Sequence, residues 1–242
     1  MENLPQAFVE NMARRLGDEL PAFLRTYEEP YWRGVRHNPL KSTETPPLSL
    51  TERVPWEPTG WYLSQEDTAG ARPLHEAGAY YLQEPSAMLP AAVLAPRPGE
   101  RVLDLCAAPG GKSTQLGLRM AGQGLLVCNE PVPKRAEVLA RNVERMGVAN
   151  ALVVSAMPGL LADRWPEGFD AVLVDAPCSG EGMFRRHPET RQEWSPEAAK
   201  GCARRQADIL DCAAEMVRPG GRLVYSTCTL NRTENEDTVE AF

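Results

Sequence analysis

The stretch that most constrains the fold runs from Arg101 to Gln115 and reads RVLDLCAAPGGKSTQ. It begins with a nearly continuous apolar run, Val102 to Cys106, of the kind that a strand needs when helices cover both faces of its sheet. The run ends at Pro109-Gly110-Gly111, where small residues let the backbone turn sharply and approach a ligand, and a helix is expected from Lys112. A strand, a glycine turn and a helix N-terminus in this order predict a cofactor pocket in an α/β fold.

Three nucleotide-binding patterns contain a turn of this type, and their spacing distinguishes them. A phosphate-binding P-loop needs a glycine five residues before Gly111, where this chain has Cys106. A dinucleotide fingerprint needs G-x-G-x-x-G, which the turn does not contain. The remaining pattern is the turn of S-adenosylmethionine-dependent methyltransferases, in which an acidic residue at the end of the second strand binds the ribose, and Glu130 occupies that position. An ordinary buried strand, turn and helix in another α/β protein is the alternative.

Strand and helix patterns alternate beyond this turn, as a parallel sheet with crossover helices requires. Strands are expected over residues 125–130, 151–154, 169–175 and 222–227, and helices over 133–146 and 198–217. Ahead of the turn, apolar residues at helical spacing predict helices within residues 4–24, interrupted near Gly17 or Pro21. Recurring prolines predict short strands and loops over residues 29–71. Helical spacing returns over residues 79–94. The fold class is therefore a Rossmann-like, mostly parallel, doubly wound sheet (79–242) with a small α+β N-terminal module (1–78).

Composition excludes several classes of protein. No apolar stretch reaches the roughly 18 residues of a membrane span, and the N-terminus lacks the basic start and apolar centre of a signal peptide, so a cytoplasmic protein is expected. None of the 6 cysteines forms a C-x-x-C pair, so no metal site is expected. The net charge of −7 argues only weakly against nucleic-acid binding, because basic residues still cluster locally, at 14–15, 33–41, 185–187 and 204–205.

Two cysteines follow predicted strand ends. Cys178 lies in Pro177-Cys178-Ser179 and Cys228 in Thr227-Cys228-Thr229. The carboxyl ends of parallel strands meet at one edge of a sheet, so both segments are expected near the glycine turn. Core cysteines usually lie among large apolar residues, whereas these two have small neighbours, which favours a chemical role.

A thiolate suits a methyltransferase that acts on a pyrimidine. Carbon 5 of cytosine is a poor nucleophile, and a thiolate that adds at carbon 6 pushes electron density onto it. An acid at ring nitrogen 3 would favour this addition, and Asp175, at the end of a predicted strand, is placed for that contact. A base must then remove the carbon-5 proton before the thiolate leaves, and a second cysteine would assist this step.

Three blocks, DLCAAPGGKSTQ, DAPCSGEGMFRR and YSTCTLNRTENE, stand in this order and resemble the signature blocks of the Sun-type (NSUN) RNA cytosine-C5 methyltransferases. The resemblance continues at the front of the chain through YEEPYWRGVRHNPLK and HEAGAYYLQEPSAMLP. Within the family, the chain is most similar to the bacterial small-subunit ribosomal RNA enzymes of the RsmF kind. The resemblance implies methyl transfer from S-adenosyl-L-methionine to carbon 5 of cytosine in RNA, with 16S ribosomal RNA as the expected substrate. It also implies an RNA-contacting N-terminal module. The chain is expected to be a monomer.

The resemblance implies a role for each site residue. Cys228 would attack carbon 6 and Cys178 would assist release, although spacing leaves this order open, since DNA cytosine methyltransferases use the cysteine of the Pro-Cys pair as nucleophile. Lys112 would orient Asp175 or the base. The residues that would bind the cofactor are Ala107, Ala108, Pro109, Gly110, Gly111, Lys112, Ser113, Glu130 and Asp175.

Two features depart from the family pattern. The acidic residue expected after the third strand, on the adenine side, is replaced by Ser155-Ala156-Met157. The chain ends at Phe242, within the helix expected after the fifth strand, so the last strands of the fold and a C-terminal RNA-binding region are expected to be missing. Two alternatives stay open, namely an RNA-binding ribosome-assembly factor without catalysis and a 5-methylcytosine enzyme that acts on transfer RNA or another RNA.

Overall fold

The computed structural model describes residues 4–242, so Met1 to Asn3, at the start of the predicted N-terminal module, lie outside the described residues. The chain forms two compact units. Unit 1 combines the chain up to Tyr31 with Ala176–Asp208 and Ser226–Phe242, and unit 2 combines Trp32–Asp175 with Ile209–Tyr225. The glycine turn therefore belongs to unit 2, and both cysteine loops belong to unit 1.

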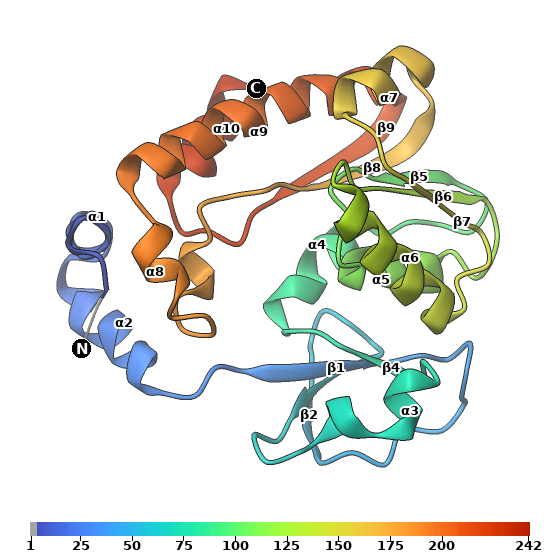
Figure 1. Ribbon diagram of the computed structural model, residues 1–242, viewed down its shortest axis with the longest axis horizontal. Helices are drawn as coiled ribbons and strands as arrows, with labels where there is room; N and C mark the ends of the chain where they lie inside the picture. The colour runs from blue at the N-terminus through green and yellow to red at the C-terminus, as the bar shows by residue number, and fades with distance from the viewer. Residues whose placement is uncertain (1–3) are drawn as a thin grey trace. The chain divides into compact units, whose positions relative to one another are not determined.

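A five-stranded sheet forms the centre of unit 2 and confirms the predicted α/β class (Figure 1). Its strand order is β7-β6-β5-β8-β9. The strand β5 lies between β6 and β8 and is parallel to both, and β6 is parallel to β7. The strand order reverses between β5 and β8, which is where ligands bind in open α/β sheets. The strands are β5 (Arg101–Asp104), β6 (Leu125–Asn129), β7 (Ala151–Val154), β8 (Phe169–Asp175) and β9 (Val217–Ser226).

Helices cover both faces of this sheet. The helices α4 (Leu89–Leu94), α5 (Gly111–Arg119) and α6 (Pro133–Met146) lie on one face, and α7 (Pro158–Arg164) lies on the other (Figure 1). Apolar residues of β5, β6 and β8, and those of α4, α5 and α6 that pack on them, form a buried cluster, because a parallel sheet is covered by helices. The helix α6 ends where the sequence predicts it, at Gly147, which has a φ of +73°.

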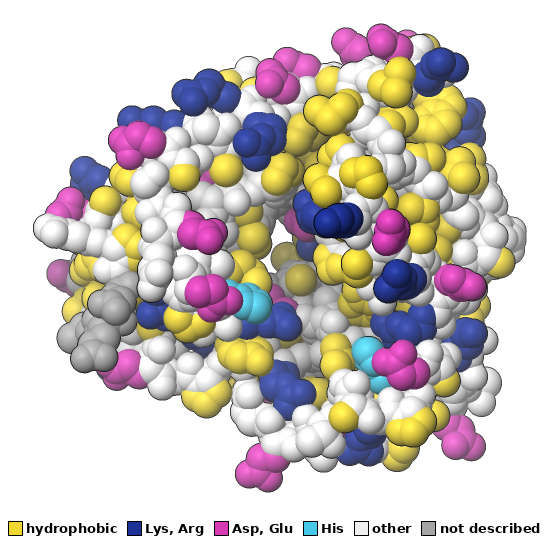
Figure 2. Space-filling view, viewed as in Figure 1, with side chains coloured by type: hydrophobic (Ala, Val, Ile, Leu, Met, Phe, Trp, Pro, Cys, Tyr) yellow, Lys and Arg dark blue, Asp and Glu magenta, His cyan; other side chains and the backbone are white. Residues whose placement is uncertain are grey.

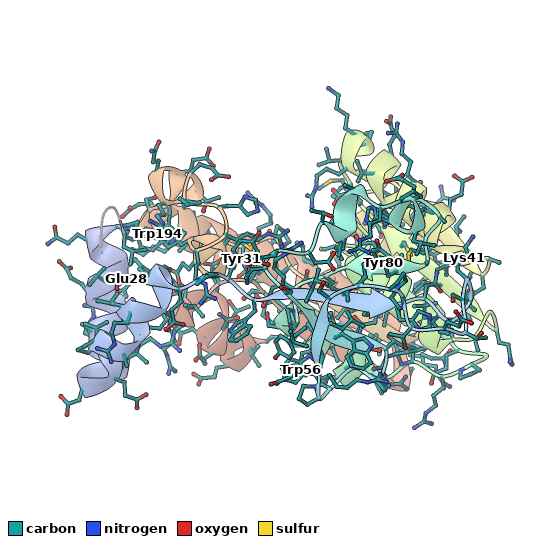
Figure 3. The ribbon with its side chains drawn as sticks, turned by 90° about the horizontal axis from the view of Figure 1, so that it is seen from below. Glu28, Tyr31, Lys41, Trp56, Tyr80 and Trp194 are labelled. Atoms are coloured by element: carbon teal, nitrogen blue, oxygen red, sulfur yellow. The ribbon has the colours of Figure 1, made fainter. Side chains whose placement is uncertain are left out.

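A four-stranded antiparallel sheet, in the order β2-β3-β1-β4, also belongs to unit 2. Its strands are β1 (Arg33–His37), β2 (Leu50–Arg53), β3 (Gly60–Leu63) and β4 (Tyr80–Leu82), and α3 (Pro73–Glu76) precedes β4. The expected helix over 79–94 is wrong in its first part. Tyr80 instead pairs with His37 and buries its ring with Val35 and Leu63, so packing overrides the helical spacing. Figure 3 labels Tyr80 and Trp56 in this region. The division of the chain at residue 78 stays a prediction.

Unit 1 is built around aromatic side chains. It contains α1 (Gln6–Leu16), α2 (Leu20–Arg25), α8 (Thr190–Glu193), the first part of α9 (Pro196–Met216) and α10 (Glu236–Ala241). The Phe8 ring on α1 packs against Phe184, with 5.2 Å between centroids, and against Trp194, which Figure 3 labels. Because Phe184 follows the Cys178 loop, this cluster anchors that loop to the N-terminal helices. No helix in residues 4–242 is long and apolar enough to cross a membrane.

Candidate active site

The glycine turn lies at the carboxyl end of β5, beside the point where strand order reverses. Gly110 has a φ of +111°, and a Cβ added there would lie 3.2 Å from Leu139 Cδ1, so both backbone and space favour glycine. The Ala107 N–H donates to the Asn129 carbonyl at 2.8 Å, which joins the loops after β5 and β6. The helix α5 begins at Gly111, and its N-terminus therefore faces the turn.

Three carboxylates, Asp104, Glu130 and Asp175, stand at the ends of the neighbouring strands β5, β6 and β8. Cys106, which follows β5, lies close enough to these carboxylates for their charges to shift the pKa of its thiol. Burial first, and then the charges of Asp104, Asp175 and Glu130, raise the pKa of the Cys106 thiol to about 12. A thiol whose pKa is raised in this way is a poor nucleophile near neutral pH, so Cys106 is not a candidate nucleophile.

Asp104 is a site residue that the sequence analysis did not single out. Its side chain is fully buried, and Oδ2 accepts a hydrogen bond from Ser113 Oγ at 2.6 Å. Burial raises the pKa of this carboxyl to about 7. Oδ1 has no hydrogen-bond partner in the part of the chain that the structure describes. A charged residue inside an apolar run is the signal that could have identified it.

Two predicted site residues form an ion pair across the carboxyl ends of β5 and β8. Lys112 Nζ lies 2.7 Å from Asp175 Oδ2, and both side chains stay partly accessible, with exposed fractions of 16% and 30%. Glu130 is more enclosed, with 2% of its side chain exposed. It accepts the Val132 N–H at 3.0 Å and pairs with Arg135 at 3.3 Å.

Arg36, on β1, contacts the glycine turn from the N-terminal part of the chain. Its side chain is fully buried, and burial lowers the pKa of its guanidinium to about 10. Nε donates to Gln83 Oε1 at 2.7 Å, and Nη2 donates to the Gly111 carbonyl at 2.9 Å and to Thr114 Oγ1 at 2.8 Å. Arg36 thus fixes the first turn of α5. No local pattern could have revealed this contact, because its partners lie far away along the chain.

The segment Ser155-Ala156-Met157, which lacks the family's acidic residue, follows β7. The Ala156 N–H donates to Asn129 Oδ1 at 3.1 Å, and Asn129 Nδ2 donates to the Leu105 carbonyl at 3.1 Å. Asn129 therefore joins the loops after β5, β6 and β7. The Met157 side chain extends outward, with 67% of its surface exposed.

The two predicted cysteines meet within unit 1. Cys178 Sγ lies 3.1 Å from Cys228 Sγ, at hydrogen-bond distance for sulfur. The hydrogen bond to Cys228, followed by burial, raises the pKa of the Cys178 thiol above its ordinary value. Either sulfur could be the donor in this contact, and Cys228 is the more exposed residue of the two. Among residues 4–242, no group of three or more His, Cys, Asp or Glu could hold a metal ion.

The chain is similar to known proteins over nearly its whole length. Residues 91–242 match the family described as 16S rRNA methyltransferase RsmB/F, and residues 4–85 match the N-terminal domain of 16S rRNA methyltransferase RsmF. Ribosomal RNA small subunit methyltransferase F of Salmonella paratyphi A is 39% identical, over 96% of this chain and 52% of that protein. The chain thus spans about half the length of the curated relatives it matches.

Solved structures show the same fold. A methyltransferase homolog protein from Pyrococcus horikoshii is 29% identical with a TM-score of 0.81, over 98% of this chain and 82% of that one. NSun6 from Pyrococcus horikoshii with SFG is 21% identical with a TM-score of 0.87, over 99% and 87% of the two chains, and shows the fold alone. The family match covers more than half of the chain and confirms the resemblance carried by the three blocks. This chain belongs to the 16S rRNA methyltransferase RsmB/F family.

Proposed function

We propose that the protein carrying this chain transfers a methyl group from S-adenosyl-L-methionine to carbon 5 of a cytosine in 16S ribosomal RNA. The observation that carries the proposal is the contact between two thiol side chains, Cys178 and Cys228, at 3.1 Å on loops that follow strand ends. The relatives' name, ribosomal RNA small subunit methyltransferase F, supports the substrate. Methylation of cytosine is the chemistry for which a methyltransferase needs a thiolate.

The pocket of unit 2 fits this cofactor. S-adenosylmethionine carries a sulfonium and an ammonium group, and the carboxylates of Glu130 and Asp175, at the carboxyl ends of β6 and β8, suit these positive charges. Ala107, Ala108, Pro109, Gly110, Gly111, Lys112 and Ser113 would hold the methionine part, whose carboxylate suits the N-terminus of α5. Glu130 would accept hydrogen bonds from the ribose hydroxyls, and Asp175 would line the pocket toward the base. The bound cofactor supplies an electrophilic methyl group.

The adenine side of the pocket differs from the family pattern. In place of an acidic residue the chain has Ser155-Ala156-Met157, and the Ala156 N–H is already bonded to Asn129. We assign the adenine contact to the Met157 side chain, whose exposed fraction of 67% leaves a thioether surface available for packing against a ring.

The two thiols take different roles. The Cys228 thiolate would add to carbon 6 of the cytosine, and the electron pair of the bond between carbons 5 and 6 would form the new bond from carbon 5 to the methyl group. The methyl–sulfonium bond would break at the same time and leave its electron pair on sulfur, which gives S-adenosylhomocysteine. A base then removes the carbon-5 proton, the bond from sulfur to carbon 6 breaks, and its electron pair returns to Cys228. Cys178, whose sulfur lies 3.1 Å from that of Cys228, would donate a hydrogen bond that stabilises the thiolate as it leaves. Asp175, held by Lys112, contacts the base at ring nitrogen 3.

Two single variants of the full-length protein test these roles. Cys228→Ala should show no methylation and no covalent RNA adduct, because it removes the nucleophile, yet it should still bind RNA and cofactor. Cys178→Ala leaves the attack intact and slows release, so it should accumulate a protein-RNA complex that survives a denaturing gel. The double variant should show no complex.

The opposite pattern, an adduct in Cys228→Ala and none in Cys178→Ala, would move the nucleophile to the Pro-Cys position. Methylation intact in both variants would remove thiolate catalysis. If calorimetry detected no binding of S-adenosylmethionine to the full-length protein, an RNA-binding assembly factor would replace the enzyme as the function. The matched control is Cys202→Ala, because Cys202 is a cysteine on α9 outside the pair.

The substrate is proposed to be ribosomal RNA of the small subunit in the cytoplasm, and the protein is proposed to act as a monomer. Bisulfite mapping of RNA from a deletion strain should show lost 5-methylcytosine in 16S ribosomal RNA only. Loss in transfer RNA would assign the activity to that substrate instead. Light scattering of the full-length protein checks the oligomeric state.

A further inference from the structure

Two buried glutamates connect the loops that carry the cysteines. Glu181 follows the Cys178 loop on a short 3-10 helix, Glu181–Met183, and Glu234 ends another, Arg232–Glu234, beyond Cys228. Glu181 is 1% exposed and Glu234 is 0% exposed. Both lie in unit 1 together with the two cysteines. Burial of a carboxylate costs several kcal/mol unless hydrogen bonds offset it, so their contacts need an explanation.

Each glutamate binds the loop opposite its own. Glu234 accepts hydrogen bonds from the backbone N–H of Ser179 at 2.9 Å and from the Ser179 hydroxyl, directly beside Cys178. Glu181 accepts the N–H of Leu230 at 3.2 Å and the side-chain amide of Asn231 at 3.1 Å, two and three residues after Cys228. The arrangement is reciprocal, because each cysteine loop is bound by the glutamate that follows the other cysteine in the chain.

Four further hydrogen bonds reinforce this connection. Gln206, on α9, donates to Glu234 Oε2 at 2.9 Å and to the Pro177 carbonyl at 3.0 Å, so it supports the Cys178 loop from behind. The hydroxyls of Ser179 and Thr229 lie 3.0 Å apart. The Gly182 N–H donates to the Cys228 carbonyl at 2.9 Å, and a Cβ at Gly182 would lie only 2.7 Å from that oxygen. The two cysteine loops therefore approach closely along several residues.

We propose that Glu234 and Glu181 are positioning residues, which hold the Cys178 and Cys228 loops in one register so that the two sulfur atoms face each other. Neither carboxylate is assigned a contact with RNA or cofactor, so each acts through the cysteines. Charge-assisted hydrogen bonds to backbone and hydroxyl donors are short and directional, and therefore suit a rigid connection between two loops. The catalytic meaning of this role rests on the proposed function, whereas the geometric role does not.

The test uses two readouts on the full-length protein. The first is the rate at which diamide joins Cys178 to Cys228, mapped by peptide analysis; the two thiols give up two electrons and two protons, and diamide is reduced to the hydrazine. The second is the kcat of methyl transfer together with the KM for S-adenosylmethionine. The variants are Glu234→Gln and Glu181→Gln, and Glu189→Gln, an exposed glutamate of unit 1 that hydrogen bonds to His187, is the matched control.

For Glu234→Gln we expect disulfide formation and kcat each to fall by on the order of tenfold to a hundredfold, because a misplacement of about 1 Å has that effect on a catalytic geometry. The KM for S-adenosylmethionine should stay within about twofold, because the cofactor pocket lies in unit 2 and contains neither glutamate. Glu181→Gln should behave in the same way but more weakly, since it accepts one backbone N–H and one side-chain amide.

A less disruptive variant, Ser179→Ala, keeps the proposal testable if Glu234→Gln does not fold. Ser179→Ala removes the hydroxyl that contacts both Glu234 and Thr229 and keeps the backbone N–H. It should slow disulfide formation by about threefold to tenfold. Added to Glu234→Gln, it should have little further effect, because both changes act on one connection.

Unchanged disulfide rates and unchanged kcat in Glu234→Gln, Glu181→Gln and Ser179→Ala would overturn the proposal. A fall in kcat without any change in the disulfide rate would also overturn it, because the glutamates would then act by another route. A wild-type protein that transfers no methyl group, but whose disulfide rate still depends on Glu234, would support the positioning role while contradicting the proposed function.

Discussion

The proposed contact between Glu130 and the cofactor ribose can be tested by the affinity for S-adenosylmethionine. Glu130 directly follows β6, the second strand of the parallel sheet, and is almost fully enclosed, so its carboxylate is held in one orientation beside Arg135. Each hydrogen bond from a ribose hydroxyl to a carboxylate contributes roughly 1.5 to 3 kcal/mol to the binding free energy. Glu130→Ala in the full-length protein should therefore weaken S-adenosylmethionine binding by on the order of a hundredfold, measured by calorimetry, and Glu130→Gln should weaken it less.

Glu137→Ala is the matched control, because Glu137 is an exposed acidic residue on α6. Unchanged cofactor affinity in Glu130→Ala would show that the ribose is bound elsewhere.

Asp104 makes the stability of the fold depend on pH. Its pKa is raised from 3.8 to about 7 by burial, so the folded state favours the protonated carboxyl. The stabilisation of the folded state by the protonated Asp104 carboxyl is fully present below the ordinary pKa of aspartate and is lost as the pH rises through about 7. A pKa shift of this size corresponds to on the order of 4 kcal/mol in the free energy of unfolding. Asp104→Asn does not titrate. Its melting temperature relative to wild type should therefore rise between about pH 5 and pH 8.

Asp163→Asn, an exposed change on α7, should keep a constant difference from wild type over the same range. A constant difference for Asp104→Asn would mean that Asp104 is not buried as a titrating group.

At the scale of elements, the antiparallel sheet and the parallel sheet of unit 2 are joined at the glycine turn. Arg36, on β1, donates to Gln83, to the Gly111 carbonyl and to Thr114, so one side chain connects β1 to α5. Arg36→Met removes these bonds and leaves buried acceptors unsatisfied. The free energy of unfolding should fall by on the order of 2 to 4 kcal/mol in urea titrations. Cofactor binding should weaken by about tenfold, because the first turn of α5 loses its support.

Arg97→Met is the control, since Arg97 is exposed, and it should change stability by less than about 0.5 kcal/mol. Equal stability of Arg36→Met and Arg97→Met would show that β1 does not hold the glycine turn.

At the scale of the whole molecule, a net charge of −7 has to be compatible with the proposed RNA substrate. Figure 2 shows Lys and Arg side chains interspersed with Asp and Glu on the visible face. If the protein binds RNA as proposed, we expect binding to depend on small basic clusters rather than on the overall field. One such cluster is Arg204-Arg205, both exposed on α9.

Replacing both arginines, as Arg204→Gln with Arg205→Gln, should weaken RNA binding and make it less sensitive to salt. If each arginine meets one phosphate of a single strand, the slope of log K against log salt should fall by about 1.4. Filter binding at several salt concentrations measures this slope, and calorimetry should find cofactor affinity unchanged. Arg97→Gln is the control, and the same slope in both proteins would exclude Arg204 and Arg205 from the RNA interface.

The sequence alone determined the parallel sheet, its glycine turn and the family. These features are local: apolar runs predict strands buried on both faces, Gly110 and Gly147 mark sharp turns, and each signature block occupies about a dozen consecutive residues. The same local reasoning was wrong at Tyr80, where burial against Val35 and Leu63 outweighed a helical spacing.

Only the tertiary structure decided which side chains support the site. Arg36 bonds to Gly111 across 75 residues, Cys178 meets Cys228 across 50 and Glu234 binds Ser179 across 55. The partners of Asp104 and Glu181 likewise depend on how strands and loops come together. Sequence spacing cannot specify such contacts, because they form when burial brings distant segments together, and the cost of an unpaired buried polar group then selects the partner.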